Sequence, residues 1–170
     1  GEAGSIVTDP STNFGINKDK DGSIKVLFLD YTLSNGYINK DGVFVNLTFK
    51  VLGSSTITIS KATFGDRSLS PISAKLTAGT VTVGGGGVVP TNPPTEPTTP
   101  PVMSGFTAYV DSVSASAGQQ IVVPVKLANV PSSGISTADM TITYDPSKLE
   151  YISGEAGSIV TDPSTNFGIN

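Results

Sequence analysis

One segment of this sequence occurs twice without a single change, and it limits how the chain can be organised. Residues 1–17 and residues 154–170 both read GEAGSIVTDPSTNFGIN. A perfect repeat at such a long spacing is typical of an array of near-identical modules. We therefore expect the beginning of the sequence to lie in one module and its end in the next, with each copy of the segment in the same structural position of its own module.

A stretch rich in Gly, Pro and Thr lies between the two copies. Residues 84–102 read GGGGVVPTNPPTEPTTPPV, a composition that disfavours a packed core and favours an extended polyproline II spacer. We therefore expect an intermodular linker at residues 85–102, which separates residues 1–84 from residues 103–170.

The composition excludes several classes of function. The chain has no Cys, His or Trp, and its net charge is -4 with ten Lys and Arg. These absences exclude disulfides, Cys/His zinc sites and His-based catalytic triads. Ten scattered basic residues offer no patch that could follow a nucleic-acid backbone. No apolar run reaches the roughly eighteen residues of a membrane-spanning helix. We expect neither nucleic-acid binding nor membrane insertion.

Alternating apolar and polar residues indicate strands on both sides of the linker. The clearest segments are residues 42–52, 55–60, 79–83, 120–127 and 136–144. In residues 42–52 the odd-numbered side chains form the expected buried face, and Phe44 lies on the outer face among polar residues. In residues 136–144 the even-numbered side chains are expected to be buried, with Thr137 and Asp139 exposed. Because no long amphipathic helix is apparent, we expect an all-β sandwich or barrel.

Residues 24–31 (IKVLFLDY) are apolar on both faces of the expected strand. The two alternating pairs are Val26 with Phe28 and Leu27 with Leu29. A sandwich that buries one pair leaves the other to be covered by something else. The uncovered pair could bind a protein partner, or the strand could be a central one that is packed on both sides. The polar neighbours disagree, since Asp30 favours an exposed even-numbered face and Lys25 an exposed odd-numbered face.

Residues 17–22 (NKDKDG) match the opening of an EF-hand calcium loop. Such a loop needs oxygen ligands at alternate positions, Gly at the sixth and a bidentate Glu at the twelfth. The twelfth position is Phe28. We therefore expect a hairpin turn here and no metal site.

Placing residues 103–170 in front of residues 18–84 restores one uninterrupted β-rich sequence. In this order the chain carries a series of short motifs: Val110-Asp111-Ser112-Val113, Val123-Pro124-Val125, Gly134-Ile135, Asp139, Tyr144-Asp145-Pro146, Leu149-Glu150, Val160-Thr161-Asp162-Pro163 and Lys40-Asp41-Gly42-Val43-Phe44. With the Pro-Thr linker, this series resembles the cohesin modules of cellulosomal scaffoldins, and the KDGVF block is similar to type I cohesins. Residues 1–84 would then be the C-terminal part of one cohesin and residues 103–170 the N-terminal part of the next.

The resemblance implies both a fold and a function. The fold is a nine-stranded jelly-roll β-sandwich, completed by the two halves on either side of the linker. The function is to bind dockerin, a calcium-loaded module carried by plant-cell-wall-degrading enzymes, so that a cellulosome assembles. The cohesin itself would have no catalytic residues and no cofactor, since the calcium belongs to the dockerin. Its place would be outside the cell, in a complex at a bacterial cell surface.

The resemblance also implies which residues contact dockerin. They are Thr137, Asp139, Asn17, Val26, Phe28, Tyr31 and Leu69. Asp139 stands where cohesins usually have an aspartate that hydrogen-bonds dockerin, and Thr137 stands where an asparagine is frequent. Val26 and Phe28 would face outward by the same alignment. Tyr31 would lie near a position where a charged contact residue is often found.

A second function remains open from the sequence. Carbohydrate-binding modules share the jelly-roll architecture and the secreted, linker-joined setting. They usually stack sugars on coplanar Trp or Tyr side chains, and this chain has no Trp and five scattered Tyr. The absence favours the scaffold interpretation.

The sequence also leaves three assemblies open. The chain could be a circular permutant, in which the linker joins the two ends of one domain. The two halves could be exchanged between chains, as in domain swapping. The chain could also be one period of a longer protein, in which the linker connects neighbouring cohesin modules.

Overall fold

The computed structural model describes residues 12–30, 36–84 and 105–160, and these ranges contain twelve strands and no helix. The strands are β1 (Thr12–Lys20), β2 (Ser23–Asp30), β3 (Gly42–Val51), β4 (Ser55–Gly65), β5 (Pro71–Ile72), β6 (Lys75–Thr77), β7 (Gly79–Val83), β8 (Thr107–Val110), β9 (Val113–Ala115), β10 (Gln120–Ala128), β11 (Thr137–Thr143) and β12 (Leu149–Ala156). The predicted linker at residues 85–102 lies outside the described residues.

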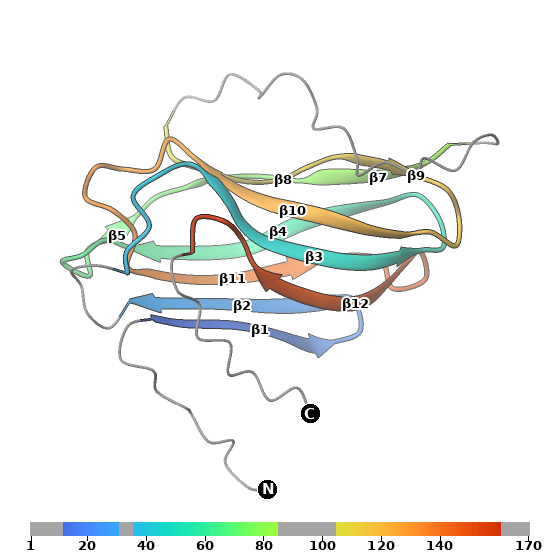
Figure 1. Ribbon diagram of the computed structural model, residues 1–170, viewed down its shortest axis with the longest axis horizontal. Coiled ribbons are helices and arrows are strands. Elements are labelled where there is room, and N and C mark those ends of the chain that lie inside the picture. Colours follow the sequence, from blue (N-terminus) through green and yellow to red (C-terminus); the bar gives the residue numbers. More distant parts are fainter. Residues whose placement is uncertain (1–11, 31–35, 85–104, 161–170) are drawn as a thin grey trace, which may run out of the picture.

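The strands form two sheets that pack face to face (Figure 1). The larger sheet has the order β1-β2-β11-β4-β7-β9, with β5 paired to β4. The smaller sheet has the order β12-β3-β10-β8-β6. Each sheet ends in one parallel pair, β7 with β9 and β6 with β8, and is otherwise antiparallel. The predicted all-β sandwich is confirmed, whereas the predicted count of nine strands is not.

Both sheets combine strands from the two sides of the linker. β3 pairs with β10 on one side and with β12 on the other, and β11 pairs with β2 and β4. Figure 1 shows the orange β11 between the blue β2 and the green β4, and the teal β3 between the orange β10 and the red β12. The two segments therefore complete one sandwich within a single chain, and neither holds a complete sheet by itself.

The alternation of buried and exposed residues confirms the expected core, apart from Phe44 and the partly buried Val43 in β3. Leu47, Phe49 and Val51 are buried as predicted, but Phe44 is fully buried as well, so its predicted place on the outer face is wrong. The cause is a β-bulge. Val125 of β10 pairs with Val45 and the next residue pairs with Val43, which leaves Phe44 without an opposite residue. The bulge turns both Phe44 and Val45 inward.

The predicted exposure of Val26 and Phe28 is also wrong. Val26 is 0% and Phe28 2% exposed, and the outward side chains of β2 are Lys25 and Leu27. The ring of Phe28 packs edge-on against Phe44, with 6.1 Å between ring centroids. Even-numbered side chains of β2 therefore face the second sheet, and the preference of Lys25 for solvent was the correct indication.

Asp30 favoured an exposed even-numbered face in the sequence analysis, but it lies on the buried face of β2. It is fully buried, and its backbone N–H donates to the carbonyl of Ser136 over 2.8 Å. Ser136 is fully buried too, and its Oγ has no hydrogen-bond partner among the described residues. Asp30 thus occupies a buried polar position at the end of β2 and does not mark its solvent face.

The β1–β2 connection is the hairpin that the sequence predicted. Lys20 pairs with Ser23, and Gly22 adopts a positive φ of 81°. A Cβ on Gly22 would lie 2.8 Å from the backbone oxygen of Tyr144. The turn therefore requires Gly both for its conformation and for its close approach to the end of β11.

The two copies of the repeat contribute different parts to this sandwich. From the first copy the structure describes residues 12–17, which form most of β1. From the second copy it describes residues 154–160, which form the end of β12 and the following turn. No position of the repeat is described in both copies, so their expected equivalence in two modules stays a prediction.

Candidate functional site

The outer face of the larger sheet gathers three of the predicted contact residues. We call this surface the β11 face and define it by the outward side chains Asn17, Lys25, Leu27, Lys61, Thr63, Thr137, Asp139 and Thr141. β11 is an interior strand, hydrogen-bonded on both edges. Its backbone groups are therefore already paired, and this part of the surface presents side chains alone.

Asp139 lies at the centre of the β11 face. Leu27 stands opposite it on β2 and Thr63 on β4. Leu27 is 52% exposed, whereas Asp139 is half-buried by its neighbours. The Asp139 carboxylate makes no hydrogen bond or ion pair within the ranges that the structure describes. An exposed apolar side chain thus adjoins a carboxylate that keeps its acceptor capacity for a partner.

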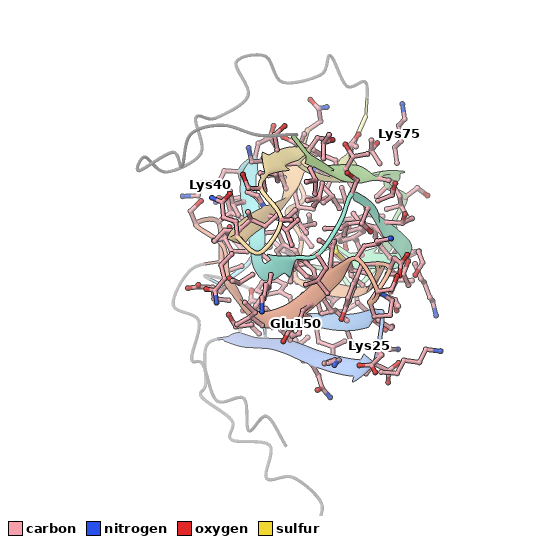
Figure 2. The ribbon with its side chains drawn as sticks, turned by 90° about the vertical axis from the view of Figure 1, so that its right-hand side faces the viewer. Lys25, Lys40, Lys75 and Glu150 are labelled. Carbon is pink, nitrogen blue, oxygen red and sulfur yellow. The ribbon has the colours of Figure 1, made fainter. Side chains whose placement is uncertain are left out.

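A row of basic residues borders this centre. Thr141 pairs with Lys25 on β2 and with Lys61 on β4, and Asn17 pairs with Lys25 from β1. Figure 2 shows Lys25 beside the blue strands β1 and β2. Adjacent strands are about 4.8 Å apart, so the two lysines lie on strands about 10 Å apart. They give this end of the face a positive charge that suits acidic groups on a partner.

The side chain of Thr137 depends on a glycine across the sheet. Thr137 pairs with Gly65, and a Cβ there would lie 2.5 Å from Thr137 Oγ1. Because Gly65 has no side chain, the Thr137 hydroxyl can lie over the neighbouring strand. The Thr137 hydroxyl therefore covers the buried backbone of Gly65, and Thr137 itself stays partly exposed on the face.

Leu69 projects from a tight turn that follows β4. The turn is held by Asp66, whose Oδ1 accepts hydrogen bonds from the backbone N–H groups of Ser68 at 2.8 Å and Ser70 at 2.9 Å. Leu69 has a φ of 60° and is 62% exposed. β4 ends at Gly65, opposite Thr137, so the turn lies at the Thr137 end of the β11 face. An apolar side chain held exposed by a strained turn is a candidate contact.

An ion pair lies near the β11 face but not on it. Lys18 Nζ lies 2.6 Å from Asp21 Oδ1 beside the β1–β2 turn. The hydrogen bond to Asp21 and its negative charge raise the pKa of Lys18. Lys18 pairs with Ile24, whose side chain faces the core, so the lysine does not belong to the β11 face, and Asp21 compensates its charge.

The structure brings three of the seven predicted contact residues together on one face: Asn17, Thr137 and Asp139. Leu69 lies at the edge of this group. Val26 and Phe28 are core residues and cannot touch a partner on the outer face. Tyr31 lies outside the described residues.

Sequence reasoning missed Leu27 and the basic row of Lys25 and Lys61. The signal that could have found them is Lys25, because a lysine at an odd-numbered position of β2 favours an odd-numbered outer face. The pairing of β2 and β4 with β11 could not be read from the sequence, because these strands are far apart along the chain.

Neither a metal site nor a membrane span is found in the described ranges. No group of three or more Asp and Glu side chains comes together there to hold a metal ion. No helix long and apolar enough to cross a membrane occurs among the same residues.

Comparison with known proteins identifies the family. The model of the family described as "Cohesin domain" matches residues 1–83 and 106–170. The chain is 37% identical over 97% of its length to Cellulose-binding protein A of Clostridium cellulovorans. It is 34% identical over 95% to Cellulosomal-scaffolding protein A, and 32% over 92% to Cellulosomal-scaffolding protein B, both of Acetivibrio thermocellus.

The match covers only a small part of these relatives. The chain spans 8% of the Clostridium cellulovorans protein, and 9% and 20% of the two scaffolding proteins. No solved structure is significantly similar to it. The predicted resemblance is confirmed by a family model that matches most of the chain on both sides of the linker: the chain belongs to the cohesin domain family and is a cohesin module of the scaffoldin type.

Proposed function

We propose that the β11 face binds dockerin modules, and that the domain thereby holds plant-cell-wall-degrading enzymes in a cellulosome. Cohesin domains of scaffoldins are non-catalytic structural modules, so a scaffold role follows from the family. The observation that supports this particular face is the pairing of exposed Leu27 with Asp139 on an interior strand.

The chemistry of the β11 face suits a folded protein partner. Leu27 offers apolar area that a partner can remove from water, which contributes about 25 cal/mol per Å². Asp139 and Thr137 offer acceptors and hydroxyls that fix the orientation of the partner. Lys25 and Lys61 favour acidic groups opposite them and speed association at low salt. Such a mixture of an apolar centre with polar and charged surroundings is typical of protein–protein interfaces.

The carbohydrate alternative has less support. Tyr144 is buried with its ring 5.1 Å from that of Phe49, and the ring of Tyr37 lies under the Arg67 guanidinium at 4.5 Å. These two tyrosines are engaged within the domain and cannot form a flat platform for a sugar ring. Cellulose binding remains the outcome that would favour this alternative.

We further propose that the domain acts outside the cell, in a cell-surface complex. The relatives include two cellulosomal scaffolding proteins, and a Cellulosome-anchoring protein of Acetivibrio thermocellus is 43% identical over 36% of the chain. The calcium needed for binding would be held by the dockerin.

The first prediction is that single substitutions on the β11 face weaken dockerin binding. Asp139→Ala and Leu27→Ala are each expected to raise the dissociation constant about tenfold or more, as at the centre of an interface. The measurement is calorimetric titration with a panel of calcium-loaded dockerin modules, together with a cellulose pull-down.

Two matched variants serve as controls. Glu150→Ala removes a carboxylate from β12, on the other sheet, and Leu52→Ala removes a leucine that is 48% exposed. Both are expected to bind dockerin as the parent chain does. Equal weakening by the controls would exclude the β11 face, and binding to cellulose without binding to any dockerin would exclude the proposed function.

A further inference from the structure

Two lysines of the smaller sheet are neutralised within the domain. Lys50 Nζ of β3 lies 4.0 Å from Glu150 Oε2 of the neighbouring β12. Lys126 Nζ of β10 lies 2.8 Å from Asp111 Oδ2. These four residues therefore add no net charge to the outer face of that sheet.

The lysines of the β11 face are not neutralised in this way. Lys25 of β2 and Lys61 of β4 make no ion pair within the ranges that the structure describes. The side chains that define this face carry two positive charges against the single negative charge of Asp139. The chain as a whole has a net charge of -4. The positive charge is therefore a local property of this surface.

A β-bulge in β4 turns Lys61 outward. Thr141 of β11 pairs with Lys61 and the next residue, Ile142, pairs with Ile59, which leaves Ser60 without an opposite residue. Ile59 is buried, so uninterrupted alternation would bury residue 61 as well. The bulge instead leaves Ser60 and Lys61 both exposed, and Ser60 Oγ donates to the Thr141 carbonyl over 3.1 Å. The bulge thus aims the Lys61 side chain at the β11 face.

Thr141 places a hydroxyl between the two lysines. It pairs with Lys25 on one side and with Lys61 on the other. Thr143, on the same side of β11, donates its hydroxyl to the Thr58 carbonyl over 3.4 Å. The Thr141 hydroxyl makes no hydrogen bond within the described part of the chain. Two ammonium groups and one hydroxyl can therefore donate to carboxylates of a partner.

The neighbouring row of the face has a different chemistry. Asp139 accepts hydrogen bonds, and Leu27 opposite it is 52% exposed. Asp139 and Thr141 are two residues apart on β11, which corresponds to about 7 Å along a strand. A partner that contacts both rows must place a hydrogen-bond donor over Asp139 and an acidic group about 7 Å away over Thr141.

We propose, on the basis of the dockerin binding proposed above, that Lys25 and Lys61 determine which dockerins this domain binds. They select modules that carry acidic side chains beside the group that contacts Asp139. They reject modules that carry basic side chains there, because like charges would be brought together. The same attraction acts during the approach of the partner and accelerates association at low salt.

The test measures association and dissociation rates by surface plasmon resonance. The probes are calcium-loaded dockerin modules that differ in their acidic and basic side chains. The parent domain is expected to bind the acidic modules most tightly, with an association rate that falls about tenfold or more between about 50 mM and about 500 mM salt. The double variant Lys25→Glu with Lys61→Glu is expected to reverse the ranking of the modules. The neutral pair Lys25→Gln with Lys61→Gln is expected to flatten the salt dependence.

The matched control is the double variant Lys40→Glu with Lys75→Glu. It changes the net charge by the same amount as the reversal at Lys25 and Lys61. Both control lysines are exposed and lie far from Lys25 (Figure 2). The control is expected to rank the modules as the parent domain does. Circular dichroism of all variants checks that the exposed substitutions leave the fold unchanged.

Failure of this inference is distinguishable from failure of the proposed function. If Asp139→Ala and Leu27→Ala weaken binding but the charge reversals change neither the ranking nor the salt dependence, the β11 face binds dockerin without this selection. If the control changes the ranking as strongly, the selection depends on net charge and not on Lys25 and Lys61. If no module binds the parent domain, both the proposed function and this inference are wrong.

Discussion

Phe44 is a residue at which the two sheets of this cohesin domain pack against each other. Its ring lies edge-on to Phe14 of β1 and Phe28 of β2, so it joins the smaller sheet to the edge of the larger one. Edge-to-face aromatic pairs add about 0.5–1.5 kcal/mol to the free energy gained by burial. The bulge in β3 that turns this ring inward therefore contributes directly to stability.

The second prediction is that Phe44→Ala lowers the free energy of unfolding by about 3–5 kcal/mol, because it removes a fully buried ring and leaves a cavity. Urea denaturation of both proteins measures the difference. Val43→Ala is the matched control, since Val43 is only partly buried on the other side of the bulge. A loss below about 1 kcal/mol for Phe44→Ala would contradict the role that its packing implies.

At the scale of strands, β12 forms one edge of the smaller sheet and carries a tyrosine against the core. The ring of Tyr151 lies 5.8 Å from that of Phe49 on the neighbouring β3. Burial, and to a smaller extent the charge of Tyr144, raises the pKa of Tyr151 to about 12. The folded state therefore holds this proton more tightly than the unfolded chain, whose tyrosines titrate near a pKa of about 10.

The third prediction is a loss of stability at high pH that depends on Tyr151. Since the folded pKa is raised, its contribution is fully present below about pH 10 and is lost as the pH rises towards 12. Tyr151→Phe should show a shallower decline of unfolding free energy over this range. Urea denaturation at several pH values from neutral to strongly alkaline measures both slopes. Equal slopes would assign the decline to other groups, such as Tyr144.

The strands differ in how far the sequence predicted them. β11 was predicted correctly on both faces, because Thr and Asp alternate with apolar residues along it. β2 could not be resolved, because both of its faces are apolar and the choice depends on which face meets β3. The bulge at Phe44 was also beyond reach, because it arises from the pairing of β3 with β10 across the linker. Local alternation thus predicts a strand, whereas its partners determine which face is buried.

For the molecule as a whole, the order of strands in space differs from their order in the sequence, and this makes each half depend on the other for its strand neighbours. β3 would lose both neighbours, β10 and β12, without residues 105–160, and β11 would lose β2 and β4 without residues 12–84. Each half alone would leave long sheet edges and apolar faces unpaired. We therefore expect each of the two segments to be stable only in the presence of the other.

The fourth prediction is that the two halves restore the domain when they are supplied as separate polypeptides. Residues 1–84 and 105–170 are each expected to lack cooperative unfolding alone. Mixed in equal amounts, they should recover the β-sheet circular dichroism spectrum and unfold cooperatively, with a midpoint that rises with concentration as association requires.

A matched control uses the first polypeptide with Phe44→Ala, which should reassociate more weakly because loss of the fully buried ring leaves a cavity in the core that both segments build. Its backbone carbonyl accepts a hydrogen bond from Gly157, so the substitution leaves this bond available and removes only the ring. Cooperative unfolding of either polypeptide by itself would show that one segment folds independently. It would thereby contradict the mutual dependence that the interleaved sheets imply.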